Sequence, residues 1–385
     1  MNRHEAVSFY IAAPGGVGGG GAERVIISLA NGFAKMGVRT DLVMKQANGP
    51  YLSLVSDDVT VVNLGAHIGT AAGNPLAKAR RFLSALRRLR DYMVDRRPRA
   101  MISAVTLENL VAVMARKLAG SDCRLLLGQR DTMSRMSHWH ARALARWLYP
   151  LSDGVVAVSR GVAEDLVKVV PGIRDKVTVI CNPVDLHGIR RLSQMEPDHP
   201  WFIGSQSQVV LAVGGLKTVK DFATLVRAFA EVRRTRPLKL VILGDGPERG
   251  RLEALVSELG LSGDVSLPGF TANPYACMRR SAVFVLSSVT EGFPNVLLEA
   301  LACGCPVVST DCQSGPDEIL EGGKWGELVP VGNPGALAAA MVRALENPLP
   351  GEQLVSRAAF YSIDRAVSQY YGALNDGARK GGLRT

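Results

Sequence analysis

The sequence predicts an α/β protein made of two doubly wound, parallel-sheet domains, and three observations support this. Its 385 residues, 47% of them hydrophobic, exceed the roughly 250 to 300 residues that one core usually holds. Short β-branched runs alternate with longer helical patterns in both halves of the chain, which is the rhythm of βαβ units. That rhythm stops over residues 182–208, which are rich in Pro, Gly, Ser and Gln, and then resumes. We therefore expect a linker over residues 183–204.

The expected elements follow one another in the same way in both domains. The first domain, residues 1–182, contains the strand VSFYIAA, a helix from Ala22, and the strands TDLVM, AMISA, CRLLLG, GVVAVS and VTVI. The second domain, residues 205–360, contains the strand VVLAVGG, a helix over Asp221 to Arg234, the strand KLVILGDG, a helix near 247–259, and the strands VSLPGF, AVFVLSS and PVVST. Ser159 and Ser314 suit helix N-caps. Ligands bind beyond the carboxyl ends of such strands, so we expect the active site in a cleft between two facing sheets.

The composition excludes several protein classes. The short apolar stretch at the start runs into glycines, without the small-residue cleavage site of a signal peptide. No apolar run approaches the ~18 residues that span a bilayer. The six cysteines are scattered, which favours a reducing cytoplasm over a disulfide-stabilised secreted domain. Cys303, Cys305 and Cys312 lie close together, but without a nearby histidine they are interpreted as structural thiols.

Positive charge is concentrated in the first half of the chain. Residues 1–182 contain 25 Lys and Arg against 14 Asp and Glu, whereas the whole chain has a formal net charge of +10. This asymmetry favours an anionic partner for the first half: nucleic acid, phospholipid headgroups or a phosphorylated substrate.

A glycine run separates the first strand from the first helix. It comprises Gly15, Gly16, Gly18, Gly19, Gly20 and Gly21, which allow backbone to approach a ligand and place a helix N-terminus beside it. Three of these glycines also match the dinucleotide-binding pattern. However, Asp41 begins the second strand, whereas a ribose-binding acid should end it, so a nicotinamide oxidoreductase is disfavoured. A tight turn without a ligand is the alternative.

The segment SSVTEGFPNVLLEALACGCPVVST is the most informative part of the chain. It follows a buried strand and predicts a helix of about ten residues that starts just after Glu291, with Pro294 in its first turn and Gly304 at its end. The N–H groups of Phe293, Asn295 and Val296 would face a phosphate. Glu299 could accept hydrogen bonds from a ribose diol, and Glu291 could reach the sugar or its phosphate.

This segment resembles the signature of the family 4 retaining glycosyltransferases, two glutamates separated by seven residues. The resemblance continues through GCPVVSTDCQSGPDEIL and GELVPVGNP, and upstream through VAVSRGVAEDL, VICNPVD, LAVGGLKTVKDFATLVRAF and LVILGDGPERGRLEALVSELGL. It implies a GT-B fold of two facing Rossmann-like domains, with the donor in the second and the acceptor in the first.

The resemblance also implies roles for individual residues. Glu299 is the ribose-binding acid and Glu291 the donor-sugar acid. The cradle around donor phosphate and sugar comprises Gly292, Phe293, Pro294, Asn295 and Val296. The tail 361–385 is expected to cross back to the first domain through an apolar set made of Phe360, Ile363, Val367, Tyr370, Tyr371 and Leu374.

Similar enzymes place an arginine, and five or six residues later a lysine, against the diphosphate. Lys220 matches the lysine, whereas Gly215 occupies the arginine position and leaves only Lys217 nearby. A missing cation would slow the chemistry or require a substitute. Gly246 and Phe270 are expected near the base, which the resemblance implies is uracil; for Gly246 a plain strand-to-helix turn is the alternative.

No Asp-x-Asp motif occurs, which favours catalysis without a metal or other cofactor, the UDP-sugar being a co-substrate. In similar enzymes the departing phosphate takes the acceptor's proton, so no protein base is required. Arg130 follows a strand end of the first domain and resembles an arginine-bearing segment near the family's active site. We therefore include Arg130 with Glu291 and Lys220 as expected catalytic residues, and Gly18, Gly19, Gly20 and Gly21 as a phosphate or acceptor loop.

Two basic stretches, residues 76–99 and 133–148, predict a membrane-facing surface. The first has nine Lys and Arg against two Asp, with Phe82, Leu83, Leu86, Leu89 and Met93 on one helix face. The second repeats the stripe with Met136, Trp139, Ala143 and Trp147. Either the basic edges of these two stretches bind anionic lipid, or their apolar stripes pack on the sheet of the first domain with the basic edges in solvent.

These observations predict a cytoplasmic, metal-independent retaining glycosyltransferase, held peripherally at the inner membrane face. It would move a hexose or N-acetylhexosamine from a UDP-sugar to a saccharide or lipid-linked acceptor, in surface polysaccharide or glycolipid synthesis, with no nucleic-acid partner. A nucleotide-sugar epimerase or hydrolase of the same fold, and a non-catalytic sugar-nucleotide-binding protein, are the alternatives. An epimerase or hydrolase would convert the donor without an acceptor, whereas the binding protein would bind UDP without turnover.

Overall fold

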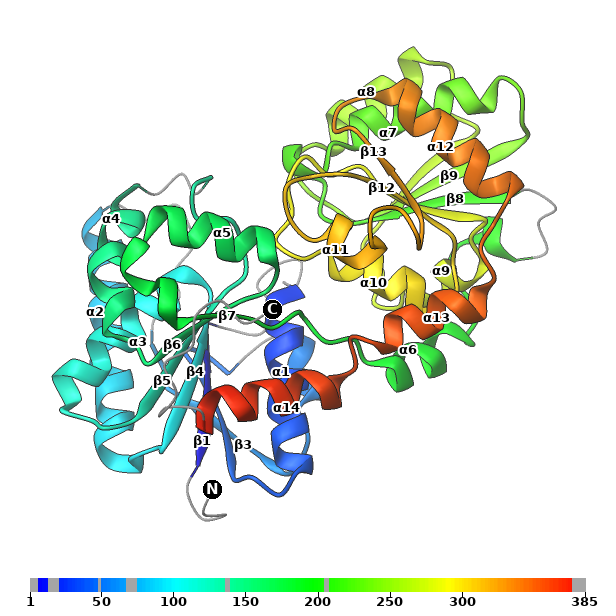
Figure 1. Ribbon diagram of the computed structural model, residues 1–385. Helices are drawn as coiled ribbons and strands as arrows, with labels where there is room; N and C mark the ends of the chain where they lie inside the picture. The colour runs from blue at the N-terminus through cyan, green and yellow to red at the C-terminus, as the bar shows by residue number, and fades with distance from the viewer. Residues whose placement is uncertain are drawn as a thin grey trace. The chain divides into compact units, whose positions relative to one another are not determined.

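A computed structural model describes residues 6–12, 21–47, 50–66, 75–135, 139–203 and 208–375. The chain divides into two compact units, one formed by Met1–Pro183 with Ile363–Thr385 and the other by Val184–Ser362 (Figure 1). Both units alternate strands with helices, as the sequence predicts. The predicted α/β class with two parallel sheets is therefore confirmed.

The first unit is built on a seven-stranded parallel sheet in the order β3-β2-β1-β4-β5-β6-β7. Its strands are β1 (Val7–Ile11), β2 (Thr40–Met44), β3 (Val59–Asn63), β4 (Ala100–Ala104), β5 (Arg124–Gln129), β6 (Gly154–Ala157) and β7 (Val177–Val179). Its helices are α1 (Gly21–Lys35), α2 (Pro75–Arg96), α3 (Thr106–Ala119), α4 (Trp139–Leu148), α5 (Arg160–Val169) and α14 (Ile363–Asn375), with the 3₁₀ turns η1 (Pro50–Leu54), η2 (Tyr149–Leu151) and η3 (Pro171–Lys176).

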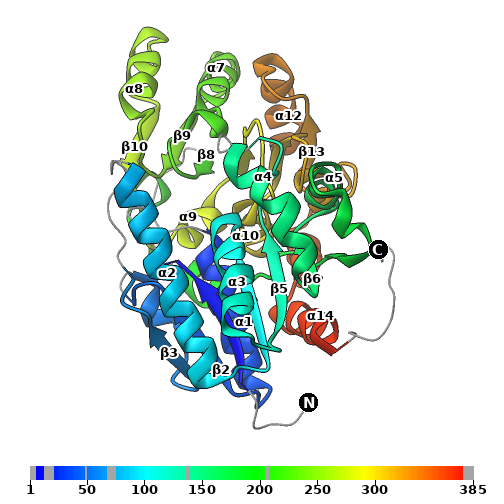
Figure 2. The same cartoon turned by 90° about the vertical axis from the view of Figure 1, so that its left-hand side faces the viewer.

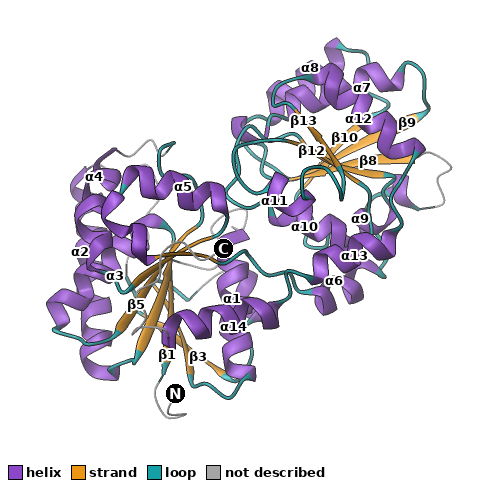
Figure 3. Cartoon of the chain, in the orientation of Figure 1, coloured by secondary structure: helices purple, strands orange, loops and turns teal. Residues whose placement is uncertain are grey.

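Helices cover both faces of this sheet. Figure 3 shows the strands between α2, α3 and α4 on one face and α1 with α14 on the other. Figure 2 shows α2 beside α3, and these two helices pack closely. On the opposite face, Gly32 of α1 allows α14 to approach, because a Cβ there would lie 2.5 Å from Val367 Cγ2. The tail helix thus shares the first unit's core, although Phe360, expected in its apolar set, precedes α14 and is 47% exposed.

The second unit repeats the design with six parallel strands in the order β10-β9-β8-β11-β12-β13. The strands are β8 (Gln208–Val213), β9 (Leu238–Leu243), β10 (Val265–Gly269), β11 (Val283–Leu286), β12 (Val307–Thr310) and β13 (Glu327–Val329). The helices are α6 (Leu186–Ser193), α7 (Phe222–Arg233), α8 (Arg249–Glu258), α9 (Tyr275–Arg280), α10 (Asn295–Ala302), α11 (Pro316–Leu320), α12 (Pro334–Glu346) and α13 (Gly351–Ala359), with the 3₁₀ turns η4 (Pro200–Phe202) and η5 (Thr218–Lys220).

Strand order determines where each sheet can bind a ligand. In the first sheet the order reverses between β1 and β4, and in the second between β8 and β11. A crevice opens beyond the carboxyl ends of the strands at such a reversal. Asp41 lies at the other end, near the start of β2, where it is buried and accepts a hydrogen bond from Tyr92 Oη at 2.8 Å. Its rejection as a ribose-binding acid is therefore supported by its position.

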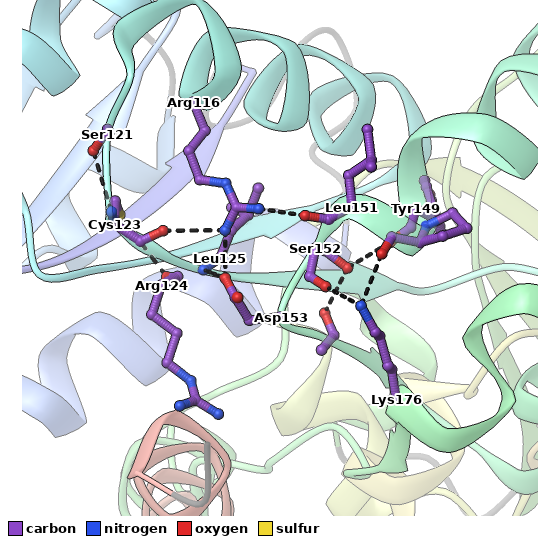
Figure 4. Close-up of polar contacts among 12 residues, drawn as sticks. Arg116, Ser121, Cys123, Arg124, Leu125, Tyr149, Leu151, Ser152, Asp153 and Lys176 are labelled. Carbon is purple, nitrogen blue, oxygen red and sulfur yellow. Dashed lines mark hydrogen bonds and ion pairs between the residues drawn. The ribbon is translucent and has the colours of Figure 1, made fainter. Parts of the chain in front are cut away.

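A polar network fixes the amino ends of β5 and β6 in the first unit (Figure 4). Asp153 forms an ion pair with Arg116 of α3 and accepts the backbone N–H of Leu125 at 2.7 Å. Lys176 donates to the carbonyl of Ser152 at 2.9 Å. Part of the positive charge of the first half is thus used within the fold and is not available to a partner.

Two sequence predictions are corrected here. Residues 183–204 are not an irregular linker: they contain α6, capped by Asp185, whose Oδ1 accepts the N–H of Gly188 at 3.0 Å. This helix packs on α9 of the second unit, and one buried apolar face was too short a signal to predict it. Ser159 does cap α5, accepting from Val162 N at 3.1 Å. Ser314 caps nothing, because the N-cap of α11 is Gly315.

Candidate active site

The expected donor-site residues lie along one edge of the second sheet, where its parallel strands end. Gly215 follows β8, Gly246 follows β9, Phe270 follows β10, and Glu291 lies in the segment after β11. All six strands run in the same direction, so their carboxyl ends share this edge. Strands β8 and β11 flank the reversal of strand order, which is where a crevice is expected.

An ion pair joins two expected catalytic residues at this edge. Lys220 Nζ lies 2.6 Å from Glu291 Oε1, and the side chains are 21% and 12% exposed. Ser288 Oγ donates to the same carboxylate oxygen at 2.7 Å. The carbonyl of Lys220 in turn accepts a hydrogen bond from Ser287 Oγ at 2.8 Å. Two hydroxyls directly after β11 thus hold both members of the pair, a role that no sequence motif indicated.

Helix α10 begins later than predicted. It starts at Asn295, and Pro294 is its N-cap with a ψ of 90°, not a residue of its first turn. The reason is tertiary packing: the ring centroids of Phe293 and Tyr361 lie 5.6 Å apart in a tilted arrangement, and a Cβ on Gly315 would lie 2.5 Å from Pro294 Cδ. The expected end of the helix is confirmed, because Gly304 follows the C-cap with a φ of +71°.

This later start divides the expected donor cradle. Asn295 and Val296 form the first turn of α10 and are half-buried, so their N–H groups can still serve the predicted helix N-terminus. Gly292 and Phe293 lie outside the helix, in a buried turn, and the prediction that they belong to it is wrong. Gly292 packs near the start of α11, since a Cβ on Gly315 would lie 3.4 Å from its carbonyl oxygen. Contact of Gly292 with donor phosphate or sugar stays a prediction.

Glu299 lies on α10, where it is half-buried. Its Oε1 accepts a hydrogen bond from Tyr275 Oη at 3.2 Å. Tyr275 is buried at the start of α9, so this contact orients the carboxylate from a neighbouring helix. No sequence signal pointed to Tyr275, because the two residues are 24 positions apart and meet only in the fold.

The remaining donor-site residues differ in what the structure assigns to them. Gly215 has room for a side chain, since an added Cβ would lie no closer than 3.7 Å to another atom, and Lys217 is exposed nearby. Gly246 has a packing role, because a Cβ there would lie 2.5 Å from the carbonyl oxygen of Leu216. Phe270 is 65% exposed beside the strand ends. Contact of Gly246 or Phe270 with a base stays a prediction.

The cysteines of the second unit are buried thiols. Burial raises the pKa of Cys303 and of Cys312 to about 12, so these groups are protonated and unreactive at neutral pH. The structural interpretation of these cysteines is therefore supported. Within the described ranges, no group of three or more His, Cys, Asp and Glu side chains is arranged to hold a metal ion. Metal-independent chemistry stays a prediction.

In the first unit, Arg130 follows β5 and is buried. Its Nη1 donates to Asn182 Oδ1 at 2.5 Å, whereas Nε and Nη2 have no hydrogen-bond partner in the described part of the chain. Arg130 also acts on the buried hydroxyl of Tyr370 in α14, through its charge and a side-chain hydrogen bond. An arginine at a strand end is suited to bind an anion or a carbonyl group.

The expected phosphate or acceptor loop of the first unit is only partly visible. Gly18, Gly19 and Gly20 lie outside the described residues. Gly21 is the first residue of α1, so the loop does lead directly into a helix N-terminus. A role of these glycines in binding stays a prediction.

A second lysine–glutamate pair, which no sequence motif singles out, lies at the corresponding edge of the first sheet. Lys45, directly after β2, places Nζ 2.6 Å from Oε1 of Glu108 in the first turn of α3. The two side chains are 12% and 6% exposed. Because these residues are 63 positions apart, no motif could reveal them.

Comparison with known proteins assigns the family. The model described as Glycosyltransferase Family 4 matches residues 19–187, and the model described as Glycosyl transferases group 1 matches residues 207–347. Together they cover both units. The chain belongs to the family 4 glycosyltransferases. This confirms the resemblance to family 4 and, with the two parallel sheets, the GT-B fold.

Two of the relatives are named as bacterial glycosyltransferases. The chain is 36% identical over 62% of its length to the N-acetylgalactosamine-N,N'-diacetylbacillosaminyl-diphospho-undecaprenol 4-alpha-N-acetylgalactosaminyltransferase of Campylobacter jejuni, of which it covers 65%. It is 31% identical over 57% of its length to the lipopolysaccharide core biosynthesis glycosyltransferase LpsE of Rhizobium meliloti, of which it covers 60%. The chain thus matches less than two thirds of the length of these relatives.

Solved structures share the whole fold at low sequence identity. The apo form of the lipopolysaccharide outer core galactosyltransferase WaaB aligns with a TM-score of 0.73 at 21% identity, covering 96% of this chain and 99% of that one. HepE of Anabaena, solved in complex with UDP-glucose, aligns with a TM-score of 0.76 at 20% identity, covering 97% and 100%. These likenesses support the GT-B assignment. Among the described helices of this family 4 member, none combines the length and apolarity needed to cross a bilayer.

Proposed function

We propose that this protein is a retaining, metal-independent glycosyltransferase that uses a UDP-sugar. It transfers a hexose or N-acetylhexosamine to a saccharide or lipid-linked acceptor in the synthesis of a surface polysaccharide or glycolipid. The observation that carries the proposal is the Lys220–Glu291 ion pair at the strand-order reversal of the second sheet, on the same edge as the start of α10.

Each residue at this edge has a role that follows from its chemistry. The Glu299 carboxylate, oriented by Tyr275, accepts hydrogen bonds from the ribose hydroxyls of UDP. The partial positive charge at the start of α10 and the Lys220 ammonium balance the diphosphate. Both hydrogen bonds to Glu291 use Oε1, so Oε2 can bind a hydroxyl of the donor sugar. There the carboxylate stabilises the positive charge that develops on the ring.

The transfer then needs no dedicated protein base. The bond between the anomeric carbon and the phosphate oxygen breaks, and UDP leaves with the electron pair. The acceptor oxygen forms the new bond on the same face of the sugar, and its proton passes to the departing phosphate. The protein contributes orientation and charge balance, which supply most of the rate enhancement when nothing is transferred to a side chain.

The acceptor class rests on the relatives and on one surface of the first unit. The Campylobacter jejuni relative is named for an acceptor linked to diphospho-undecaprenol, a membrane lipid. In this chain, Trp139 and Trp147 of α4 are 61% and 80% exposed, on a helix that also bears Arg142 and Arg146. Exposed tryptophans with basic residues are typical of a membrane-contacting helix. The proposal therefore places the protein in the cytoplasm, at the inner membrane surface.

Calorimetric titration with UDP, in buffer containing a metal chelator, tests the nucleotide site. We expect wild-type protein to bind and Glu299→Ala to lose at least about tenfold in affinity, because the ribose contacts are removed. Incubation with UDP-galactose and UDP-N-acetylgalactosamine, with and without a lipid-linked saccharide, then separates transfer from hydrolysis or epimerisation. UDP binding without turnover of any donor would favour the binding-protein alternative, as the glycine at position 215 does.

A further inference from the structure

A cavity lies at the amino edge of the second sheet, at the opposite ends of the strands from the donor-site residues. Val307, the first residue of β12, and Glu327, the first residue of β13, both line it. Its other walls come mainly from the loop before β13 and from the residues that join α12 to α13. The cavity has a volume of about 160 Å³. An engineered cavity of about 150 Å³ holds one benzene molecule, so this cavity has room for a single six-membered ring.

Two glycines hold the loop before β13 against the start of β12. Gly326 has no space for a side chain, because a Cβ there would lie 2.5 Å from Val307 Cγ2 and 2.8 Å from the Val307 carbonyl oxygen. Gly323 has a φ of +94°, which residues with a side chain rarely adopt. The glycines therefore fix the backbone on both sides of Lys324 and Trp325, which line the cavity.

The Trp325 side chain is held in place by its neighbours. The indole is half-buried, and its Nε1 donates to Glu321 Oε2 at 2.9 Å. Lys324 Nζ lies 3.5 Å from the same oxygen and 4.8 Å from the centroid of the Trp325 ring. Glu321 Oε1 in turn forms an ion pair with Arg357 at 2.6 Å. The indole is thus oriented before a ligand arrives, which reduces the entropy lost on binding.

The lining combines apolar surface with a few polar groups. Pro306, Pro348 and Leu349 line the cavity together with Trp325. Asn347 also lines it, and its exposed side-chain amide has no hydrogen-bond partner among the described residues. Small-molecule sites typically have this combination, in which apolar side chains provide contact area and polar groups fix the orientation of the ligand.

The charges that line the cavity balance each other. Among its described lining residues only Lys324 and Glu327 are charged, one of each sign. Both are already paired, Lys324 with Glu321 and Glu327 with Arg343, whose Nε donates to Glu327 Oε2 at 2.9 Å. A phosphate or a metal ion would therefore find no uncompensated opposite charge. A neutral ligand with an apolar face and hydroxyl groups fits this lining better.

We propose that this cavity, which we call the Trp325 pocket, binds one ring of a neutral saccharide. One face of a sugar ring presents C–H groups, whose slight positive charge suits the negative face of an aromatic ring. The sugar hydroxyls can accept hydrogen bonds from Asn347 and Lys324 and donate to Glu327. The choice of a saccharide rests on the proposed function, because the acceptor and the product of that reaction are saccharides. The pocket would bind a part of the glycan that does not react, and so raise the local concentration of the glycan at the enzyme.

Nuclear magnetic resonance of the indole N–H groups tests the proposal directly. The chain has four tryptophans, and the signals that Trp325→Phe and Trp201→Phe remove identify those two residues. We expect methyl α-galactopyranoside or methyl N-acetyl-α-galactosaminide to shift the Trp325 signal saturably. A Kd of about 1 to 10 mM is expected, because a single ring makes few contacts. The Trp201 signal is the internal control and should not move, since Trp201 is also half-buried beside a lysine but does not line the pocket.

Two matched variants test the polar side of the pocket. Asn347→Ala removes an exposed amide that lines the pocket and should weaken glycoside binding about threefold or more. Gln353→Ala removes an exposed amide from α13 that does not line it and should leave binding unchanged. Unfolding measurements establish that both variants are folded. Glycerol, which has hydroxyl groups but no ring, should leave the Trp325 signal in place at the same concentrations.

A Trp325 signal that stays in place up to about 50 mM of either glycoside, or that glycerol shifts equally, would overturn the proposal. Equal glycoside binding by Asn347→Ala and Gln353→Ala would also overturn it, because the assigned contacts would be absent. The titration requires neither UDP nor turnover. Failure of the wild-type protein to bind UDP would therefore contradict the proposed function alone, whereas transfer activity without any glycoside-induced shift would contradict the Trp325 pocket alone.

Discussion

Glu291 receives hydrogen bonds from both Lys220 and Ser288 on one oxygen, which leaves the other for a sugar. Glu291→Gln keeps the shape of the side chain but removes the charge that would stabilise the transition state. We expect kcat to fall about 10²- to 10³-fold, with UDP affinity within about threefold of wild type. Glu258→Gln, exposed on α8, serves as the control. A variant with wild-type kcat would contradict the role of Glu291 in donor-sugar stabilisation.

Gly215 stands where similar enzymes have an arginine, and a Cβ added there would make only ordinary van der Waals contacts. Gly215→Arg should supply a cation near the diphosphate and strengthen UDP binding by about three- to tenfold, as a partly exposed ion pair does. Calorimetry at low and high salt measures this. Gly263→Arg adds the same charge beyond the amino end of β10 and should have no effect. An unchanged affinity in Gly215→Arg would mean that the diphosphate lies elsewhere.

Glu23 should destabilise the protein at neutral pH. Burial and the neighbouring Glu108 raise its pKa above the ordinary 4.5, so the folded state holds a proton that the unfolded state has released. Stability therefore falls as pH rises from about 4.5 through the raised pKa. We expect Glu23→Gln to be more stable than wild type at pH 7, with a difference that shrinks below about pH 4. Urea unfolding at both pH values measures it, and a difference independent of pH would refute this origin.

At the scale of elements, the sequence predicts most strands and several helices in the correct order, because βαβ periodicity is a local pattern. The short strands β3 and β13 were not among the expected ones. The start of α10 shifts because Phe293 packs on Tyr361, which lies 68 positions away, so no local signal marks it. The helix α6 was missed because Pro, Gly and Ser conceal an eight-residue helix whose single apolar face packs on α9. Local propensity thus predicts elements, whereas their ends depend on contacts made in the fold.

The residues of the candidate site also fall into two groups, those that a sequence motif marks and those that only the fold identifies. Glu291 and Glu299 lie in one short motif and are visible in the sequence. Tyr275 and the Lys45–Glu108 pair are not, because their partners are distant in the sequence and meet only in the fold. Ser288 lies three residues before Glu291, but it belongs to no motif. The residues that hold a motif in position are therefore the part of a site that the fold alone reveals.

The loop after β9 provides a stability prediction at this scale. Gly244 has a φ of +141°, and a Cβ there would lie 2.0 Å from the carbonyl oxygen of Gly214. Gly244→Ala should lower the free energy of unfolding by about 3 kcal/mol or more, because strain and overlap add. Gly250→Ala on α8, where a Cβ meets nothing within 4 Å, should raise it by about 0.5 to 1 kcal/mol. Equal stabilities of the two variants in urea unfolding would show that the loop after β9 rearranges to accommodate the added methyl group.

At the scale of the whole molecule, the two predicted amphipathic stripes differ in burial. Leu86, Leu89 and Met93 of α2 are buried, and α2 packs on α3, so that stripe is mainly part of the core. Leu83 is an exception and is exposed. On α4 the stripe remains outside: Trp139 and Trp147 are largely exposed, although Met136 lies outside the described residues. Any membrane contact in these stretches should therefore depend on α4 more than on the apolar stripe of α2.

Vesicle sedimentation tests this surface. We expect the wild-type protein to bind vesicles of phosphatidylglycerol and phosphatidylcholine at low salt. Weaker binding at about 0.5 M salt is expected because the basic residues act through screened charge. Trp139→Ser combined with Trp147→Ser should weaken binding about tenfold, since both side chains would enter the interface. Leu118→Ser, an equally exposed apolar residue of α3, is the matched control. If the double variant binds like wild type, α4 does not contact lipid. If neither protein binds vesicles, the lipid-linked acceptor must be abandoned, and a water-soluble saccharide becomes the better acceptor class.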